Sequence, residues 1–236
     1  MRLDKYLSSQ TDLSRKDAKT VLRQGLVTVN GSVCKDPGLT VDPDRDRICV
    51  AGNELAFHEY LYLMLNKPED VISATEDRSR MTVLDLVPDE WYRDGLFPAG
   101  RLDADTTGFV LLTDDGAFAH DILSPKHHVQ KTYVAKLKEA PSEDSLQELR
   151  DGILLSDGTR CLPAEVEVLE DRTVRIRIVE GKYHQIRRMF AAAGNRVLSL
   201  ERTAIGPVPL DPSLGPGECR PLTEEELSAL KNRSGS

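Results

Sequence analysis

The first part of the chain carries apolar residues at helical spacing. Leu3 and Tyr6 lie on one face of a predicted helix. A second helix is predicted from Ser14, because a serine with an acid three residues later, here Asp17, is typical of an N-terminal cap. Gly25 suits the end of this helix, where a left-handed backbone is common. Two short consecutive helices are therefore expected.

Short apolar runs follow these helices. Residues 26–29 read Leu-Val-Thr-Val, which is typical of a strand, and the Asn30-Gly31 pair that follows favours a type I′ hairpin turn. Another strand is predicted at residues 48–50, after a segment rich in proline and aspartate. Residues 1–58 are therefore expected to form a compact helix-helix-hairpin module.

Beyond this module, strand-like apolar runs occur in clusters between amphipathic segments. Clustering favours a mixed, mainly antiparallel sheet with flanking helices over a doubly wound fold, in which strands and helices alternate strictly. We therefore expect an α+β protein with domains at residues 1–58 and 59–231 and a polar tail at residues 232–236. The predicted strands are 60–65, 108–112, 132–137, 164–169, 173–179 and 196–200, and the predicted helices are 116–123, 142–151 and 183–193.

Charge is distributed unevenly along the chain. The net charge of −8 argues against a protein that binds any polyanion through an all-round positive surface. Residues 1–35, however, hold seven Lys or Arg against three acids, a local excess of +4. On the second predicted helix, Arg15, Lys19 and Arg23 recur at every fourth position with Lys16 beside them. Such a stripe is either a solvated helix face or a contact for an anionic partner, and the local excess favours the partner.

Other patterns exclude several classes of protein. No apolar run approaches the roughly 18 residues that span a bilayer, and the first residues lack the apolar stretch of a secretion signal. We therefore expect a cytoplasmic protein with no membrane association. The four cysteines, Cys34, Cys49, Cys161 and Cys219, include no Cys-x-x-Cys pair, so we expect free thiols rather than a zinc or redox centre.

The densest polar segment runs from Pro98 to Gly108 and precedes an apolar run. Asp103, Asp105 and Asp114 imitate the spacing of an EF-hand calcium loop. A calcium loop needs a helix on each side, whereas Pro-Ala-Gly precedes this segment and a strand-like run fills its second half. We therefore expect no metal site here.

The N-terminal module resembles the S4 RNA-binding domain. The resemblance rests on Arg2-Leu3-Asp4-Lys5, on Ser14-Arg15 with Ala18, and on the stretch Gly25-Leu26-Val27-Thr28-Val29-Asn30-Gly31. It implies that the basic residues of this module bind RNA. The expected RNA contacts are Arg2, Arg15, Lys16, Lys19 and Arg23.

The rest of the chain resembles the RsuA branch of the pseudouridine synthases, whose type member acts on small-subunit rRNA. The matching blocks are Gly100-Arg101-Leu102-Asp103 with the residues that follow to Gly116, Lys131-Thr132-Tyr133, and Gly181-Lys182-Tyr183-His184-Gln185-Ile186-Arg187-Arg188-Met189-Phe190. Together with the S4-like module they cover almost the whole chain in family order. The resemblance implies an enzyme that isomerises a uridine of rRNA, with 16S rRNA favoured.

The resemblance also implies roles for single residues. Asp103 is the catalytic carboxylate, Tyr133 packs on the target base and is a candidate proton acceptor at C5, and Arg187 pairs with Asp103 and holds it ionised. Arg101 is expected to fill the stack that a flipped uridine vacates. The other RNA contacts expected in this domain are Lys131, His184, Gln185 and Arg188.

Several alternatives remain open at this stage. The family resemblance is shared by large-subunit rRNA enzymes, and an S4-type RNA-binding protein without activity would share the first module. A glycosidase or nucleoside hydrolase would need a second carboxylate, which Asp105 could supply. No cofactor is expected, because no phosphate-binding glycine motif is present and an isomerisation needs no redox carrier or methyl donor. The expected partner is 16S rRNA or an assembling small subunit, and the protein is expected to be a monomer.

Overall fold

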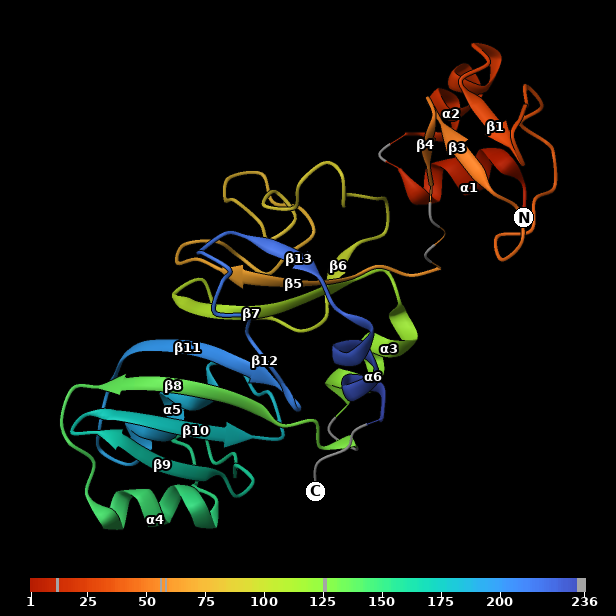
Figure 1. Cartoon of the computed structure of the whole chain (residues 1–236). Coiled ribbons are helices and arrows are strands. Elements are labelled where there is room, and N and C mark those ends of the chain that lie inside the picture. The colour runs from red at the N-terminus through yellow and green to blue at the C-terminus, as the bar shows by residue number, and fades with distance from the viewer. Residues whose placement is uncertain (12, 56, 58, 125–126, 233–236) are drawn as a thin grey trace. The chain divides into compact units, whose positions relative to one another are not determined.

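A computed structural model gives the fold of the chain, and it describes residues 1–11, 13–55, 57, 59–124 and 127–232 (Figure 1). The chain divides into two compact units, Met1–Leu61 with Val87–Leu96, and Tyr62–Leu86 with the residues from Phe97 onward. The predicted boundary after residue 58 lies near this division. The prediction did not include the return of Val87–Leu96 to the first unit, where Arg93 Nη1 donates to the carbonyl oxygen of Ser9 at 2.8 Å. Of the predicted polar tail, residues 233–236 lie outside the described residues.

The first unit has the predicted helix-helix-hairpin order. The Ser14 hydroxyl accepts a hydrogen bond from the backbone N–H of Asp17 and so caps the second helix as expected. Asn30 and Gly31 both have positive φ, as a type I′ turn requires, and join two antiparallel strands. The elements are α1 (Leu3–Gln10), α2 (Arg15–Arg23), β1 (Val27–Val29), β2 (Ser32–Val33), β3 (Ile48–Val50) and β4 (Asn53–Glu54), with the sheet order β2-β1-β3-β4.

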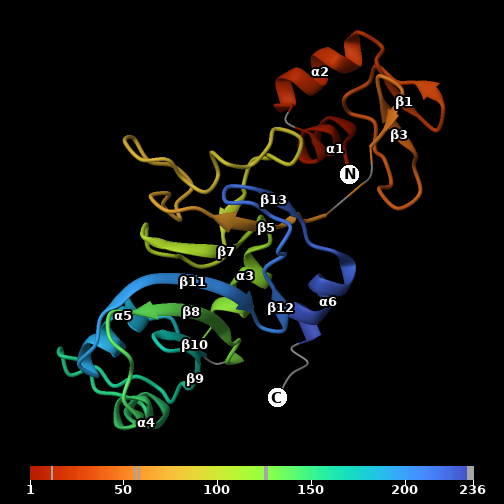
Figure 2. The same cartoon turned by 60° about the vertical axis from the view of Figure 1, so that its left-hand side comes forward.

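The second unit is built on a nine-stranded sheet (Figures 1 and 2). Its main path has the order β13-β5-β7-β11-β8-β10-β9, while β6 pairs with β7 and β12 pairs with β11. The β7–β11 pair is parallel and the other described pairs are antiparallel, which confirms the predicted α+β class with a mixed, mainly antiparallel sheet. The strands are β5 (Tyr62–Lys67), β6 (Phe97–Pro98), β7 (Thr106–Thr113), β8 (Lys131–Leu137), β9 (Glu165–Glu170), β10 (Thr173–Ile178), β11 (Val197–Ile205), β12 (Val208–Pro209) and β13 (Cys219–Pro221).

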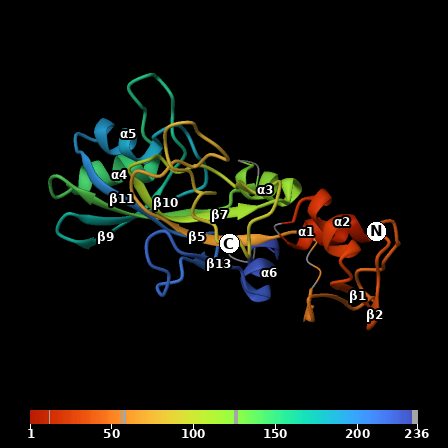
Figure 3. The same cartoon turned by 90° about the horizontal axis from the view of Figure 1, so that it is seen from above.

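Four helices accompany this sheet among the described residues: α3 (Gly116–Leu123), α4 (Glu143–Asp151), α5 (Gln185–Ala192) and α6 (Glu224–Asn232). Figures 1 and 3 show α5 on one face of β8, β10 and β11. The α5 side chains of Ile186, Met189 and Phe190 are buried, as the apolar spacing of the sequence predicts. Arg187 and Arg188 of the same helix are only partly buried.

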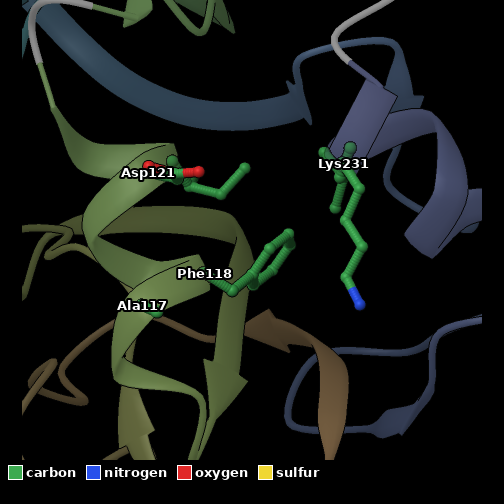
Figure 4. A pocket seen from close by; sticks show the side chains of 6 residues that line it. Ala117, Phe118, Asp121 and Lys231 are labelled. Carbon is green, nitrogen blue, oxygen red and sulfur yellow. The ribbon is translucent and has the colours of Figure 1, made fainter.

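Helix α6 was not predicted, although its sequence carries a start signal. The Thr223 hydroxyl accepts from the N–H of Glu226, and the Glu226 carboxylate accepts from the N–H of Thr223, which is a capping box. Leu230 is buried beside α3, and the Lys231 ammonium lies 5.9 Å from the centroid of the Phe118 ring. Phe118 and Lys231 line a pocket between α3 and α6 that none of the predicted site residues lines (Figure 4).

Several predicted boundaries differ from the structure by a few residues, and three of the differences have clear physical reasons. The first strand of the second unit begins two residues later than predicted and continues through Lys67, a buried charge that sequence patterns place outside a strand. Strand β11 continues past residue 200 to Ile205, because Arg202 lies buried in the sheet interior despite its charge. Helix α5 starts at Gln185, because His184 has a left-handed backbone with φ of +46° that a helix cannot accommodate.

Candidate active site

The loop that carries Asp103 is held on both sides of that residue. Ser73 Oγ accepts from the N–H of Leu102 at 3.0 Å and donates to the carbonyl oxygen of Leu102 at 3.2 Å. The carbonyl oxygen of Ala104 accepts from the N–H of Asp70 at 2.9 Å and from Lys67 Nζ at 3.1 Å. The backbone is therefore fixed one residue before and one residue after Asp103, while the Asp103 side chain stays about one-third exposed.

Lys67 is a buried residue beside the Asp103 loop that the sequence analysis missed. It is fully buried at the end of β5 and also donates to the carbonyl oxygen of Pro68 at 2.7 Å. Burial lowers its pKa to about 8, against the opposing effect of the negative charges of Asp105, Asp70 and Asp103. The only local signal is the Asn-Lys-Pro sequence directly after the predicted strand 60–65, which by itself indicates no more than the end of a strand.

The sheet brings Tyr133 to the same region. Gly108 of β7 pairs with Arg202 of β11, and Arg202 pairs with Tyr133 of β8. Two strand spacings separate Gly108 from Tyr133, or about 10 Å. Gly108 has φ of +97°, and a Cβ there would lie 2.4 Å from the carbonyl oxygen of Arg202, so this close approach of β7 to β11 requires glycine.

Arg187 forms an ion pair with Asp105, and this corrects the predicted Arg187–Asp103 pair. Arg187 Nη2 is 2.9 Å from Asp105 Oδ2 and 3.0 Å from the carbonyl oxygen of Asp105, and Nη1 donates to Val197 O at 3.3 Å. Asp103 instead has His184 as its neighbour, with Nε2 3.4 Å from Asp103 Oδ1. The reason is local geometry: His184 precedes α5 in a left-handed conformation and turns toward Asp103, while Arg187 projects from the helix to the next carboxylate.

Several buried polar atoms cluster around these residues. Thr106 Oγ1, Arg187 Nε and Arg202 Nη2 are buried and have no hydrogen-bond partner within the described part of the chain. Most buried polar atoms of a folded protein are hydrogen-bonded, and each exception calls for an explanation, of which a catalytic role is one. All three residues belong to or pair with the segment 103–108, so the geometry marks this segment and the central strands β7, β11 and β8 beside it as the candidate active site.

Comparison with known proteins gives this site a family. The RNA pseudouridylate synthase family matches residues 61–192, and the S4 domain matches residues 1–46. The chain belongs to the RNA pseudouridylate synthase family. It is 46% identical over 234 residues to the Bacillus subtilis protein named uncharacterized RNA pseudouridine synthase YtzG, with 98% of each chain covered. Both resemblances inferred from the sequence are thereby confirmed.

Other relatives match over the same length. The ribosomal small subunit pseudouridine synthase A of Escherichia coli strain K12 is 43% identical over 232 residues, which cover 98% of this chain and 100% of the relative. Among solved structures, the crystal structure of a pseudouridylate synthase has a TM-score of 0.69 and 41% identity, and covers 98% of this chain and 99% of that chain. The whole chain, including its N-terminal unit, therefore has the architecture of these pseudouridylate synthases.

Within this pseudouridylate synthase, two predicted RNA contacts are corrected by burial. Lys131 is buried and donates to the carbonyl oxygen of Ile122 in the last turn of α3, where a positive charge is favourable. Burial lowers the pKa of Lys131 to about 8. Gln185 is also buried, and its amide donates to Glu180 Oε1 at 2.7 Å and accepts from the N–H of Lys182 at 2.8 Å. Both side chains are therefore structural rather than available to RNA.

The remaining predicted residues of the second unit are accessible to different degrees. Arg101 is exposed on the Asp103 loop, and Tyr133 is 9% exposed on β8. Arg188 does not face the same way as Arg187: its guanidinium pairs with Asp157 and donates to the carbonyl oxygen of Tyr183 at 3.3 Å. The structure thus brings Asp103, His184 and Arg187 together around the loop that carries Arg101. Arg188 is directed instead toward Asp157.

The basic stripe of the S4 unit is present on α2. Ala18 and Leu22 are buried on one face, while Arg15, Lys16 and Arg23 are exposed and Lys19 is half-buried. No ion pair involving these four cations occurs among the described residues. Arg2 differs, because its guanidinium forms two hydrogen bonds of 3.0 Å with the buried carboxylate of Asp4 and thereby keeps the Asp4 pKa low.

The calcium-loop alternative does not fit this geometry. Residues Thr106–Thr113 form one extended strand, so Asp103 and Asp114 lie beyond opposite ends of it and cannot converge on one ion. Across the described ranges, no group of three or more His, Cys, Asp and Glu side chains is placed to hold a metal ion. None of the helices in those ranges combines the length and the apolar character needed to cross a bilayer.

Proposed function

We propose that the protein converts one uridine of small-subunit rRNA to pseudouridine, in free 16S rRNA or in an assembling small subunit. The names of the curated relatives of matching length support this substrate. An S4 unit whose basic stripe on α2 forms no ion pair with any other described residue supports a large RNA rather than a free nucleoside. We further propose that the protein works in the cytoplasm as a monomer and without a cofactor.

The proposed reaction moves a base without adding or removing atoms from it overall. The bond from ribose C1′ to uracil N1 breaks, the uracil turns while bound, and C1′ joins C5. The C5 proton is then lost and N1 gains one. The Asp103 carboxylate acts on the sugar or the base as nucleophile or base, and the Tyr133 hydroxyl is the candidate acceptor for the C5 proton.

The observation that carries this proposal is the fixed backbone around Asp103. Hydrogen bonds to Leu102 and Ala104 hold the loop on both sides of a partly exposed carboxylate. A group held in this way can meet a reacting atom with little further ordering. A base inside an RNA helix must be flipped out to reach Asp103, at a cost of a few kcal/mol. The exposed Arg101, two residues earlier in the loop, can offset that cost by filling the gap.

The hydrolase alternative is disfavoured by the surroundings of Asp105. A hydrolase of this kind needs a second carboxylate free to activate water. Asp105 Oδ2 instead lies 2.9 Å from the Arg187 guanidinium, which also binds the Asp105 carbonyl oxygen. We propose that Asp105 orients Arg187 beside the loop that carries Asp103 and does not act on water.

The test is tritium release from defined RNAs. Transcripts of 16S and 23S rRNA carrying [5-³H]uridine are incubated with the purified protein, and tritium in water and pseudouridine in the RNA are both measured. The proposal expects about one tritium released per 16S molecule, in step with one pseudouridine formed. Release from 23S rRNA alone would assign the large-subunit substrate, and free uracil in the products would assign a hydrolase.

A further inference from the structure

One exposed aromatic side chain beside the candidate active site has no role in the proposed reaction. Tyr183 is 76% exposed, more than any other large apolar side chain in the described residues. Single exposed apolar residues are common on proteins and need no explanation by themselves. The surroundings of Tyr183 set it apart.

The Tyr183 ring stacks on the ring of His184. The ring centroids are 3.8 Å apart and the planes differ by 19°. His184 Nε2 in turn lies 3.4 Å from Asp103 Oδ1. Tyr183 is therefore one ring stack away from a side chain that contacts the proposed catalytic carboxylate. Because the imidazole covers one face and most of the tyrosine is exposed, the other face of the ring is open.

The backbone that carries the two rings is fixed. Gln185 binds the N–H of Lys182 and the carboxylate of Glu180, and Lys182 pairs with the same carboxylate. On the other side, Arg188 donates to the carbonyl oxygen of Tyr183 and is held by Asp157.

His184 also has an unfavourable backbone conformation, with φ of +46°. The left-handed backbone of His184 is uncommon for a residue with a side chain, and such conformations occur mainly where the surrounding structure has a use for them. This conformation is what lays the imidazole under the tyrosine ring while pointing Nε2 at Asp103. The pair is thus a built feature rather than a loose surface side chain.

We propose that Tyr183, stacked on His184, is a platform for an unpaired base of the substrate RNA next to the flipped uridine. The inference rests on the proposed function, because it assumes that a uridine is brought to Asp103. Flipping one nucleotide unstacks its neighbours. An exposed aromatic ring can stack on an unstacked base whatever the sequence, because every base has a flat π-face. The platform holds the RNA strand and does not touch the reacting atoms.

The kinetic test compares Tyr183→Ala, Tyr183→Leu and Tyr183→Phe with the wild-type protein on [5-³H]uridine 16S rRNA under single-turnover conditions. Loss of the ring should raise the half-saturating RNA concentration about five-fold or more, with a smaller effect on the saturated rate. Tyr183→Phe should recover most of that loss and Tyr183→Leu should not, since leucine is apolar but has no aromatic face. Equal behaviour of Leu and Phe, or an alanine variant equal to wild type, would overturn the platform.

A second measurement locates the contact and does not depend on turnover. A photoreactive p-benzoylphenylalanine replaces Tyr183, or replaces Leu169 on the edge strand β9 as a control, and crosslinks to 16S rRNA and to small-subunit assembly particles are mapped. Crosslinks from position 183 should fall within about two nucleotides of the modified uridine. Crosslinks to a ribosomal protein, to distant RNA or to none would overturn the inference. Failure of the wild-type protein to release tritium would instead contradict the proposed function.

Discussion

The Arg187 guanidinium lies 2.9 Å from the carboxylate of Asp105, two residues after the proposed catalytic Asp103. Arg187 also binds the carbonyl oxygens of Asp105 and Val197, so three acceptors fix it between the catalytic loop and β11. The positive charge at the site is therefore anchored to the loop that carries Asp103 and is not neutralised by Asp103 itself.

This arrangement predicts a specific sensitivity at position 187. Arg187→Lys keeps the charge but reaches fewer of the three acceptors, and a hydrogen bond involving a charged group contributes roughly 1.5–3 kcal/mol. The single-turnover rate on 16S rRNA should therefore fall about ten-fold or more. Arg175→Lys is the matched control, because Arg175 pairs with Glu167 on the sheet surface and has no role in the site. Similar rates for both variants would contradict the anchoring of Arg187.

The two aspartates of the loop are predicted to differ. Asp103→Asn removes the proposed nucleophile or base and should abolish tritium release while RNA affinity stays within a few-fold of wild type. Asp105→Asn should keep substantial turnover, because Arg187 retains its bonds to the backbone carbonyls. Single-turnover assays on the same transcript measure both variants. If both lose activity equally, the paired-carboxylate hydrolase regains support, and turnover by Asp103→Asn at a tenth of the normal rate excludes its assigned role.

Lys131 is predicted to affect stability rather than RNA binding. Folding lowers its pKa from 10.5 to about 8 through burial, so between these pH values the unfolded chain holds more protons and stability rises with pH. The lowered pKa of Lys67 also makes stability rise with pH, so the pH dependence of the wild-type protein is compared with that of Lys131→Met. From pH 7.5 to pH 9.5, the wild-type free energy of unfolding should gain roughly 1–2 kcal/mol relative to Lys131→Met. Urea denaturation measures this difference.

The control for this prediction is RNA affinity. Lys131→Met should bind 16S rRNA with an affinity near that of wild type at low salt, since the ammonium faces the end of α3. A parallel pH dependence of the two proteins, or a large loss of affinity, would restore Lys131 as an RNA contact.

The basic stripe of α2 is predicted to supply affinity and little catalysis. Replacing Arg15, Lys19 and Arg23 by Ala should weaken rRNA binding and flatten its salt dependence, because each lost phosphate contact removes roughly one unit from the log–log slope. The saturated single-turnover rate should change little, because these contacts stabilise the bound substrate and the transition state equally. A triple variant of the exposed Lys138, Arg172 and Arg196 in the second unit removes the same charge and is the control. Equal salt slopes for both triple variants would remove the stripe from the RNA interface.

Sequence patterns predicted the S4 unit and most of the sheet because their signals are local. The cap at Ser14, the Asn30-Gly31 turn and the buried face of α5 depend on neighbouring residues only. The errors involve groups whose roles depend on distant partners. Lys67 and Arg202 are charged but buried, and each donates to a carbonyl oxygen of a distant segment, a partner that no local pattern shows.

The site was predicted by motif and corrected by geometry. The predicted helix at residues 183–193 contained His184, Arg187 and Arg188, whereas the left-handed backbone at His184 removes that residue from the helix. Each of the three then finds a different carboxylate: Asp103, Asp105 and Asp157. Family motifs therefore predicted which residues gather at the site, while the pairing among them required coordinates.

The most direct test of the account is the pseudouridine content of rRNA in cells that lack this protein. Pseudouridines in 16S and 23S rRNA are mapped at nucleotide resolution in the deletion strain, and in the same strain carrying either the wild-type gene or Asp103→Asn. The account predicts that one 16S position loses its pseudouridine, that the wild-type gene restores it, and that Asp103→Asn does not. Unchanged 16S rRNA in the deletion strain, or restoration of the modification by Asp103→Asn, would contradict it.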